Sequence, residues 1–109
     1  MLPHTTKLEK SLLAKTANSL KAIAHPVRLA MIELLQDGKR LNVTQIYETL
    51  GLEQAVASQH LSILKDKNIL TSKREGKHTF YFLKHECVID VITLILSTHD
   101  DYEPKKAHR

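Results

Sequence analysis

Residues 42–65, NVTQIYETLGLEQAVASQHLSILK, contain two helix-forming segments that are separated by a very short turn. In the first segment, Asn42 is a good N-cap, and Gln45 three residues later completes a capping-box pattern. Gly51 is expected to end this short helix, because glycine readily adopts the left-handed conformation that follows a last helical turn. The second helix is predicted over residues 53–67, so at most three residues separate the two.

The second helix of this pair has an unusual surface. Its apolar side chains at Val56, Leu61 and Leu64 are expected to fall near one side. If this helix lies against DNA, an exposed Val56 or Ala57 would be able to contact a thymine methyl group. Short polar groups suit the reading of base edges, because glutamine bonds adenine in two places and serine bonds bases or phosphates. A solvated helix face has the same composition, so the neighbouring segments decide between the two interpretations. The polar residues are Gln54, Ser58, Gln59, His60 and Ser62.

Two further helices are predicted before this pair. Residues 7–24 place apolar side chains at spacings of three to five, which is typical of an amphipathic helix. That helix is expected to stop at His25, because the residue before a proline is pushed out of the helical region. Pro26 suits the first position of the next helix, which Asp37 and Gly38 are expected to end.

The periodicity changes after the pair. Residues 69–74 and 78–83 are rich in β-branched and aromatic side chains and flank a turn at residues 75–77, which predicts a β-hairpin. Residues 85–98 are then apolar on most sides. A helix that is apolar all round must be buried, and a domain this small could hardly bury it alone.

This order of elements predicts the fold class. A chain of 109 residues is expected to form one domain. The fold is mainly α with a small β-hairpin, in the order α-α-α-α-β-β-α, which is a winged helix-turn-helix. We expect residues 1–98 to form one winged helix-turn-helix DNA-binding domain and residues 99–109 a polar C-terminal tail.

The charge distribution points to a polyanionic partner. The chain has a formal net charge of +4, and residues 59–84 alone hold six basic residues against two acids. Lysine and arginine neutralise phosphates and make DNA affinity dependent on salt. Arg74 or Lys77, at the hairpin tip, could enter a minor groove. A charged hairpin that only improves solubility is the alternative.

Three stretches together carry a family resemblance: LKAIAHPVRLAMIELL at 20–35, ASQHLSILKDKNIL at 57–70 and REGKHTFYFL at 74–83. In this order they resemble the ArsR/SmtB family of bacterial repressors over about residues 19–96. The resemblance implies a homodimer that binds an imperfect palindrome in double-stranded DNA. It also implies a dimer interface formed by the first and last helices, here through Leu8, Leu12, Leu20, Val88, Val91, Ile92 and Ile95.

We therefore predict that DNA contacts come from the polar helix and the hairpin. The helix would read bases and the hairpin would contact the backbone. The candidate residues are Gln54, Val56, Ser58, Gln59, His60, Lys65, Lys73, Arg74 and Lys77.

Family members often respond to metals, and two family sites can be compared with this sequence. A cysteine pair on the third helix is absent, and Cys87 is the single cysteine of the chain. The second family site uses the two ends of the last helix, where His85 and Cys87 stand at the start and His99 and Asp101 at the end. The family spacing would use Thr98 in place of His99, which lies about 100° away around a helix. We expect no conventional metal site and no cofactor.

Other functions are weighed against this hypothesis. A metal- or redox-responsive sensor of the same fold would use His85 and Cys87 with His99 and Asp101, and zinc or another transition metal would be its ligand. A protein-interaction module would predict an acidic or apolar recognition helix. An enzyme is disfavoured, because the sequence contains no phosphate loop, nucleophile elbow or acid pair set in a pocket. With one cysteine, no signal peptide and no membrane-length apolar run, a cytoplasmic location is expected.

Overall fold

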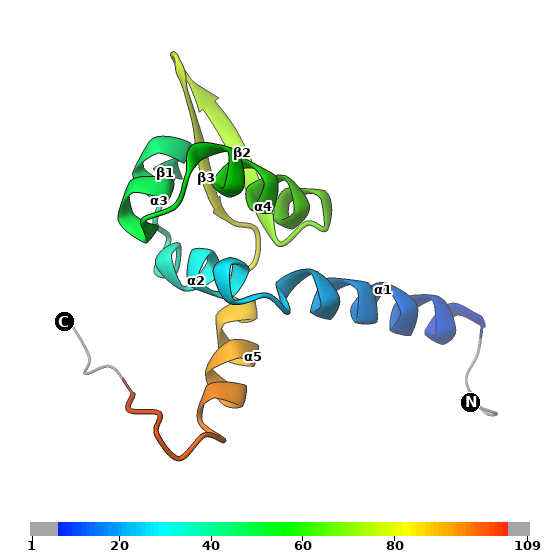
Figure 1. Cartoon of the computed structure of the whole chain (residues 1–109). Helices are drawn as coiled ribbons and strands as arrows, with labels where there is room; N and C mark the ends of the chain where they lie inside the picture. Colours follow the sequence, from blue (N-terminus) through cyan, green and yellow to red (C-terminus); the bar gives the residue numbers. More distant parts are fainter. Residues whose placement is uncertain (1–6, 105–109) are drawn as a thin grey trace.

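The computed structural model describes residues 7–104 (Figure 1), apart from the side chain of Leu8. Within this range, five helices and a three-stranded sheet follow the predicted order, with one additional short strand. The elements are α1 Lys7–Ile23, α2 Pro26–Leu34, β1 Leu41–Asn42, α3 Val43–Leu50, α4 Gln54–Asp66, β2 Leu70–Glu75, β3 His78–Leu83 and α5 Cys87–Leu96.

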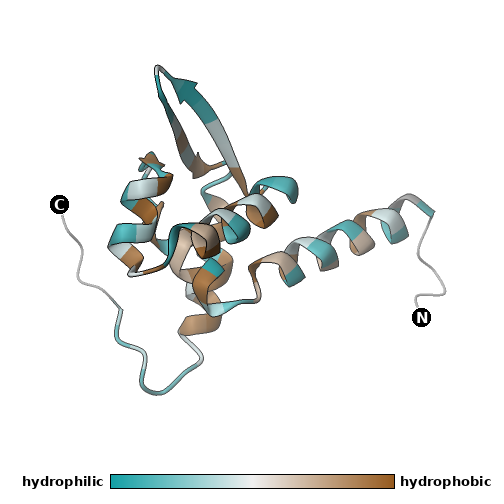
Figure 2. Ribbon diagram, turned by 45° about the horizontal axis from the view of Figure 1, so that its top comes forward, coloured by the Kyte–Doolittle hydropathy of each residue, from teal (hydrophilic) through white to brown (hydrophobic). Residues whose placement is uncertain are grey.

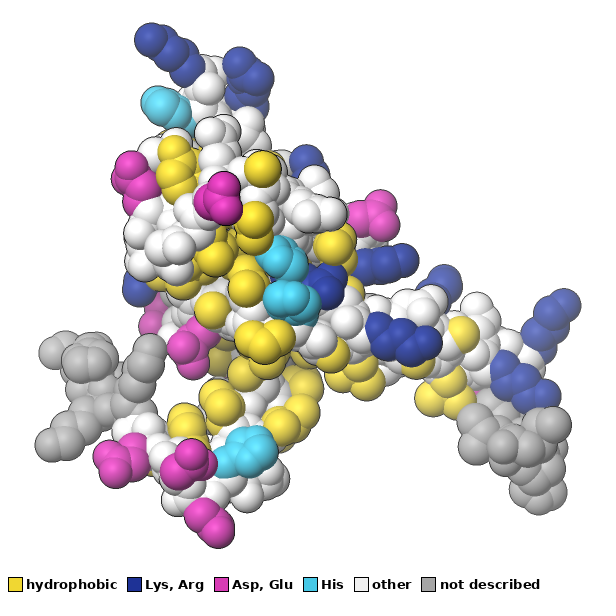
Figure 3. Space-filling view, viewed as in Figure 1, with side chains coloured by type: hydrophobic (Ala, Val, Ile, Leu, Met, Phe, Trp, Pro, Cys, Tyr) yellow, Lys and Arg dark blue, Asp and Glu magenta, His cyan; other side chains and the backbone are white. Residues whose placement is uncertain are grey.

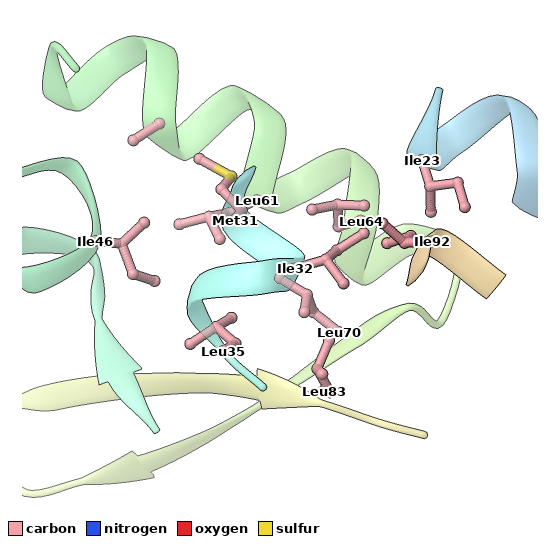
Figure 4. Packing of buried hydrophobic residues seen from close by; sticks show 11 residues of the cluster. Ile23, Met31, Ile32, Leu35, Ile46, Leu61, Leu64, Leu70, Leu83 and Ile92 are labelled. Atoms are coloured by element: carbon pink, nitrogen blue, oxygen red, sulfur yellow. The ribbon is translucent and has the colours of Figure 1, made fainter. Parts of the chain in front are cut away.

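The core lies between α2, α3, α4 and the base of the sheet, as Figure 4 shows. Helix α2 contributes two fully buried side chains and its C-cap Leu35 a third, α4 contributes three, and α1, α3, β2, β3 and α5 contribute one each to the cluster. Burial of one such leucine or isoleucine contributes about 1.5–3 kcal/mol, so this cluster is the main source of the fold's stability. Its members are Ile23, Met31, Ile32, Leu35, Ile46, Ala57, Leu61, Leu64, Leu70, Leu83 and Ile92.

The starts of α2 and α3 follow the local signals of the sequence, whereas α2 ends at Leu34, before the expected stop at Asp37 and Gly38. Pro26 begins α2, and the Nδ1 atom of His25 caps it by accepting a hydrogen bond of 3.1 Å from the Val27 amide. At α3, Asn42 and Gln45 each accept a 2.9 Å bond from the other's backbone, which completes the predicted capping box. These two predicted helix starts are confirmed.

The sheet contains one strand more than the sequence predicted. Strand β3 lies in the centre, and its two antiparallel neighbours are β2 and the two-residue strand β1. The β2–β3 hairpin closes at the Glu75–His78 pair, so its turn holds two residues and begins at Gly76, whose φ is +64°. The upper part of this hairpin is hydrophilic in Figure 2, whereas hydrophobic positions are frequent on the helices beneath it.

Helices α1 and α5 extend away from the packed body in different directions (Figure 1). Apolar side chains on both remain exposed, including Leu12, Leu20, Val91 and Ile95, and Leu94 is 69% exposed. The last helix is shorter than predicted, because it spans Cys87–Leu96 rather than residues 85–98. These exposed faces confirm that the described chain does not bury its last helix alone.

Two of the expected interface residues differ from the others. Ile92 is only 8% exposed and belongs to the core of the monomer, so it offers little surface to a partner. Val88 is partly buried and packs against the same core. Leu8 was also an expected interface residue, and its side chain lies outside the described part of the structure.

Candidate nucleic-acid interface

The turn between α3 and α4 holds the two helices in a fixed relation. Gly51 has a left-handed φ of +66°, and its amide donates to the Glu48 carbonyl at 3.3 Å. The Leu52 amide donates to the Tyr47 carbonyl at 2.9 Å. These bonds satisfy the last carbonyls of α3 and allow α4 to begin two residues after Leu52. The arrangement is a helix-turn-helix with α4 in the recognition position.

Helix α4 has a buried side and a polar exposed side. Ala57, Leu61 and Leu64 are fully buried against the core. Ala57 therefore cannot touch a thymine methyl, and that alternative of the sequence analysis is wrong. Val56 is 37% exposed and so does not share the buried side with Leu61 and Leu64, as its spacing had suggested. The exposed polar residues are Gln54, Ser58, Gln59, Ser62, Lys65 and Asp66.

His60 stands apart from the other polar residues of α4. Its ring is half-buried against His25, with 4.5 Å between the ring centroids. Its Nδ1 atom is buried and has no hydrogen-bond partner within residues 7–104. Burial lowers the pKa of His60, and the nearby His25 and Arg28 lower it further. The ring is therefore mainly neutral at pH 7, and it faces α2 more than open solvent.

The β2–β3 hairpin presents its cations at the end remote from the core. Lys73, Arg74 and Lys77 are all exposed, and Figure 3 shows dark-blue side chains gathered at the hairpin tip. The Arg74 Nε atom donates to the Gly76 carbonyl at 3.2 Å, which holds the guanidinium beside the turn. This geometry suits contact with phosphates on DNA beside a helix in the major groove.

One cation at the sheet was missed by the sequence analysis. The guanidinium carbon of Arg40, just before β1, lies 4.2 Å from the centroid of the Phe82 ring. A cation over an aromatic face is stabilised by the quadrupole of the ring. The pair joins the segment that leads into β1 to the central strand of the wing. This contact could not be predicted from the sequence, because no pattern indicated the short strand that brings Arg40 to β3.

Comparison with known proteins identifies the family. The sequence profile described as "Bacterial regulatory protein, arsR family" matches residues 25–72. The transcriptional repressor PagR of Bacillus anthracis is 38% identical over 89 residues, which cover 82% of this chain and 89% of that protein. The chain belongs to the ArsR family.

Solved structures of related proteins have the same fold. The crystal structure of PagR has a TM-score of 0.72 and covers 80% of this chain and 99% of its own. A homodimeric winged helix-turn-helix DNA-binding domain from Mycobacterium bovis, described as a possible ArsR-family regulator, is 27% identical. It has a TM-score of 0.76 and covers 96% of each chain. HlyU from Vibrio cholerae is 31% identical, with a TM-score of 0.69, covering 79% of this chain and 92% of its own.

The predicted fold class and family are confirmed by these findings. This ArsR-family chain is a winged helix-turn-helix protein and a DNA-binding transcriptional regulator. Because the family and its relatives are regulators, the prediction that the chain is not an enzyme is confirmed as well.

The candidate metal ligands of this ArsR-family chain do not share one helix. His85 precedes α5 and Cys87 begins it, whereas His99 and Asp101 follow its end at Leu96. The comparison of Thr98 with His99 around a continuous helix was therefore wrong, because both residues lie beyond the helix. All four candidates are exposed. Within residues 7–104, no three His, Cys, Asp or Glu side chains are grouped closely enough to hold a metal ion.

The start of α5 is tied to the packed body instead. The Glu86 carboxylate, between His85 and Cys87, accepts a 3.0 Å hydrogen bond from the Asp37 amide in the loop after α2.

None of the described helices is long and apolar enough to cross a membrane.

Proposed function

We propose that this regulator is a homodimeric repressor that binds an imperfect palindrome in double-stranded DNA. The observation that carries the proposal is the polar face of α4, exposed beside a basic wing and fixed by a core of its own chain. Such a face offers hydrogen-bonding groups to base edges, and the wing offers charges to the backbone. PagR, a relative of the chain, is described as a transcriptional repressor. A regulator of this kind acts where the chromosome lies, so we place it in the cytoplasm.

The apolar faces of α1 and α5 support the homodimer. An open hollow of about 400 Å³ lies between α1, α2 and α5, and its lining includes Leu20, Leu29 and Ile95. Large apolar patches on a small protein mark interaction sites. The M. bovis domain of similar structure is described as homodimeric. In a two-fold dimer each chain would place the same α1–α5 face against its partner, with recognition helices about 34 Å apart.

Different residues would contribute affinity and specificity. Gln54, Ser58 and Gln59 are exposed on α4 and would contact base edges, with Val56 near a thymine methyl. Lys65 on α4 and the wing residues Lys73, Arg74 and Lys77 would contact phosphates. We also propose that this binding needs no metal and no other cofactor, since the third helix lacks cysteine and the described residues form no metal-sized cluster.

Selection from random DNA tests the proposal. Metal-stripped, reduced protein is incubated with random-sequence duplexes at two salt concentrations, and the bound DNA is sequenced. We expect a palindromic motif and an affinity that falls steeply with salt. Enrichment of a single unrepeated half-site would contradict the dimer. Failure of any sequence to be enriched would contradict sequence-specific binding without a ligand and favour the sensor.

A further inference from the structure

Three side chains capable of carrying positive charge meet where the start of α2 contacts α4. His25 and Arg28 come from the start of α2, and His60 comes from the middle of α4. The rings of His25 and His60 pack at 4.5 Å between centroids and are tilted by 48°. His25 already uses its Nδ1 atom to cap α2.

Two nitrogens of this cluster lack hydrogen-bond partners. The Nε atom of Arg28 and the Nδ1 atom of His60 are both buried, and neither has a partner among the described residues. A buried polar atom without a partner costs about 1–3 kcal/mol. Because these two atoms have almost no exposed surface, an incoming group would meet the outer nitrogens of the half-buried side chains, and since every arginine nitrogen is a donor, a negatively charged acceptor would be the strongest partner.

The neighbouring groups that shift the pKa of His60 all carry, or can carry, positive charge. Helices α1, α2 and α3 and strand β2 all pack against α4. The charged groups that shift the pKa of His60 are His25 and Arg28, both of α2, and both lower it. An added proton on His60 would therefore be stabilised by an incoming anion.

The cluster also has a defined place on the recognition helix. Lys65 lies five residues after His60, so the two side chains point about 140° apart around α4. A helix in the major groove has a phosphate backbone along each side. Lys65 lies on the same side of α4 as Ser58. His60 lies instead on the flank that contacts α2, with Arg28 and His25 beside it, and would face the backbone at that edge of the groove.

We propose that His25, Arg28 and His60 form a contact for a backbone phosphate of DNA, and that His60 takes up a proton from the solvent when the phosphate arrives. The phosphate oxygens would accept from Arg28, and the negative charge would balance the imidazolium. This inference rests on the proposed DNA-binding function and adds residues of α2 to the interface.

Calorimetry of the unmodified protein tests the proton uptake directly. A duplex of about 30 base pairs that carries the selected motif, long enough for two half-sites, is titrated at pH 7 in MOPS buffer and in Tris buffer, neither of which contains phosphate. These buffers differ in ionisation enthalpy, so the difference in observed heat gives the protons bound. We expect a net uptake of a fraction of a proton per chain. Equal heats after correction for dilution, with tight binding in both buffers, would overturn the inference.

Substitutions test which side chain takes up the proton. His60→Gln keeps a polar side chain but cannot titrate, and we expect it to abolish most of the uptake. We expect Arg28→Gln to weaken binding roughly tenfold and to reduce the salt slope by about one. Lys10→Gln removes a charge from the exposed side of α1 and serves as the control, with binding close to that of the unmodified protein.

The outcomes separate this inference from the proposed function. If the unmodified protein binds no duplex, the proposed DNA-binding function and the phosphate contact are both contradicted. If it binds its motif but Arg28→Gln keeps the original salt slope while remaining folded by circular dichroism, only the phosphate contact fails. If Arg28→Gln does not fold, the proton uptake of the unmodified protein and its loss in His60→Gln still test the phosphate contact.

Discussion

The two parts of this molecule differ in how far a single chain buries their apolar side chains. Helices α2, α3 and α4 and the sheet enclose a core that one chain supplies by itself, including fully buried Met31, Ile32 and Leu61. Helices α1 and α5 leave large apolar side chains in solvent, with Leu12 52% and Ile95 57% exposed. The comparison teaches that the DNA-reading half folds on contacts within the chain, whereas the other half has a surface that suits a partner.

Truncation of a core residue should give the largest effect and should act on the fold itself. Leu61→Ala removes a fully buried side chain that α4 packs against the core. We expect it to lower the free energy of unfolding by about 2–5 kcal/mol, measured by urea denaturation. A loss below about 1 kcal/mol would mean that α4 is not held by this core.

A charge on the exposed apolar face should act on assembly instead. Ile95→Glu introduces a carboxylate beside the hollow between α1 and α5. In a two-fold dimer the change occurs twice at one interface, so we expect dissociation to monomers and a loss of operator affinity of about 100-fold or more. Sedimentation velocity measures the assembly, and circular dichroism should show an unchanged helical content. A dimer that persists after this change would show that the interface lies elsewhere.

Two substitutions at the DNA-facing surface should separate specificity from affinity. Gln59→Ala on α4 is expected to cost about 1–3 kcal/mol at one base position and to relax the preference there. Arg74→Ala on the wing should weaken binding to all sequences by similar factors and flatten the salt dependence. Fluorescence anisotropy with the motif, point variants of the motif and random duplexes distinguishes them. An equal loss on all duplexes with Gln59→Ala would argue against base reading.

Several helix boundaries and the wing could be predicted because single residues decide them. Pro26, the Asn42–Gln45 box and Gly51 act through the local backbone, so they give the same structure in most contexts. Strand β1 has only two residues and exists because β3 offers it a pairing edge, which no local pattern reveals.

The buried faces of α5 and α4 were harder to predict for a related reason. Helix α5 is apolar on most sides, so its sequence does not show that Ile92 enters the core while Leu94 stays exposed. His60 looked like its polar neighbours, and only the packing of α2 places it beside His25.

Acid should weaken the contact between α2 and α4. The pKa of His60 in the folded chain is lowered from 6.5, mainly by burial, so the unfolded chain binds more protons below that pH. The contribution of neutral His60 to stability is fully present above about pH 6.5 and is lost as the pH falls through the lowered pKa. We expect the melting temperature to decline in this window and His60→Gln to decline less. Parallel curves for the two proteins would contradict this account.

Zinc should have the smallest effect. The four candidate ligands are exposed and do not share one helix, so we expect a zinc titration to leave operator affinity within about twofold. A large loss of affinity that disappears in Cys87→Ser would contradict the expectation and establish a metal sensor.

The spacing of the two half-sites tests the central claim most directly, because a dimer joined through α1 and α5 fixes the distance between its recognition helices. The selected motif is compared with a version that carries about five additional base pairs at its centre, which turns one half-site to the opposite side of the duplex. The account predicts two chains per duplex on the original motif and a loss of affinity of at least about 100-fold on the lengthened one. Equal affinity for both duplexes would show that each chain binds DNA alone and would contradict the homodimeric repressor.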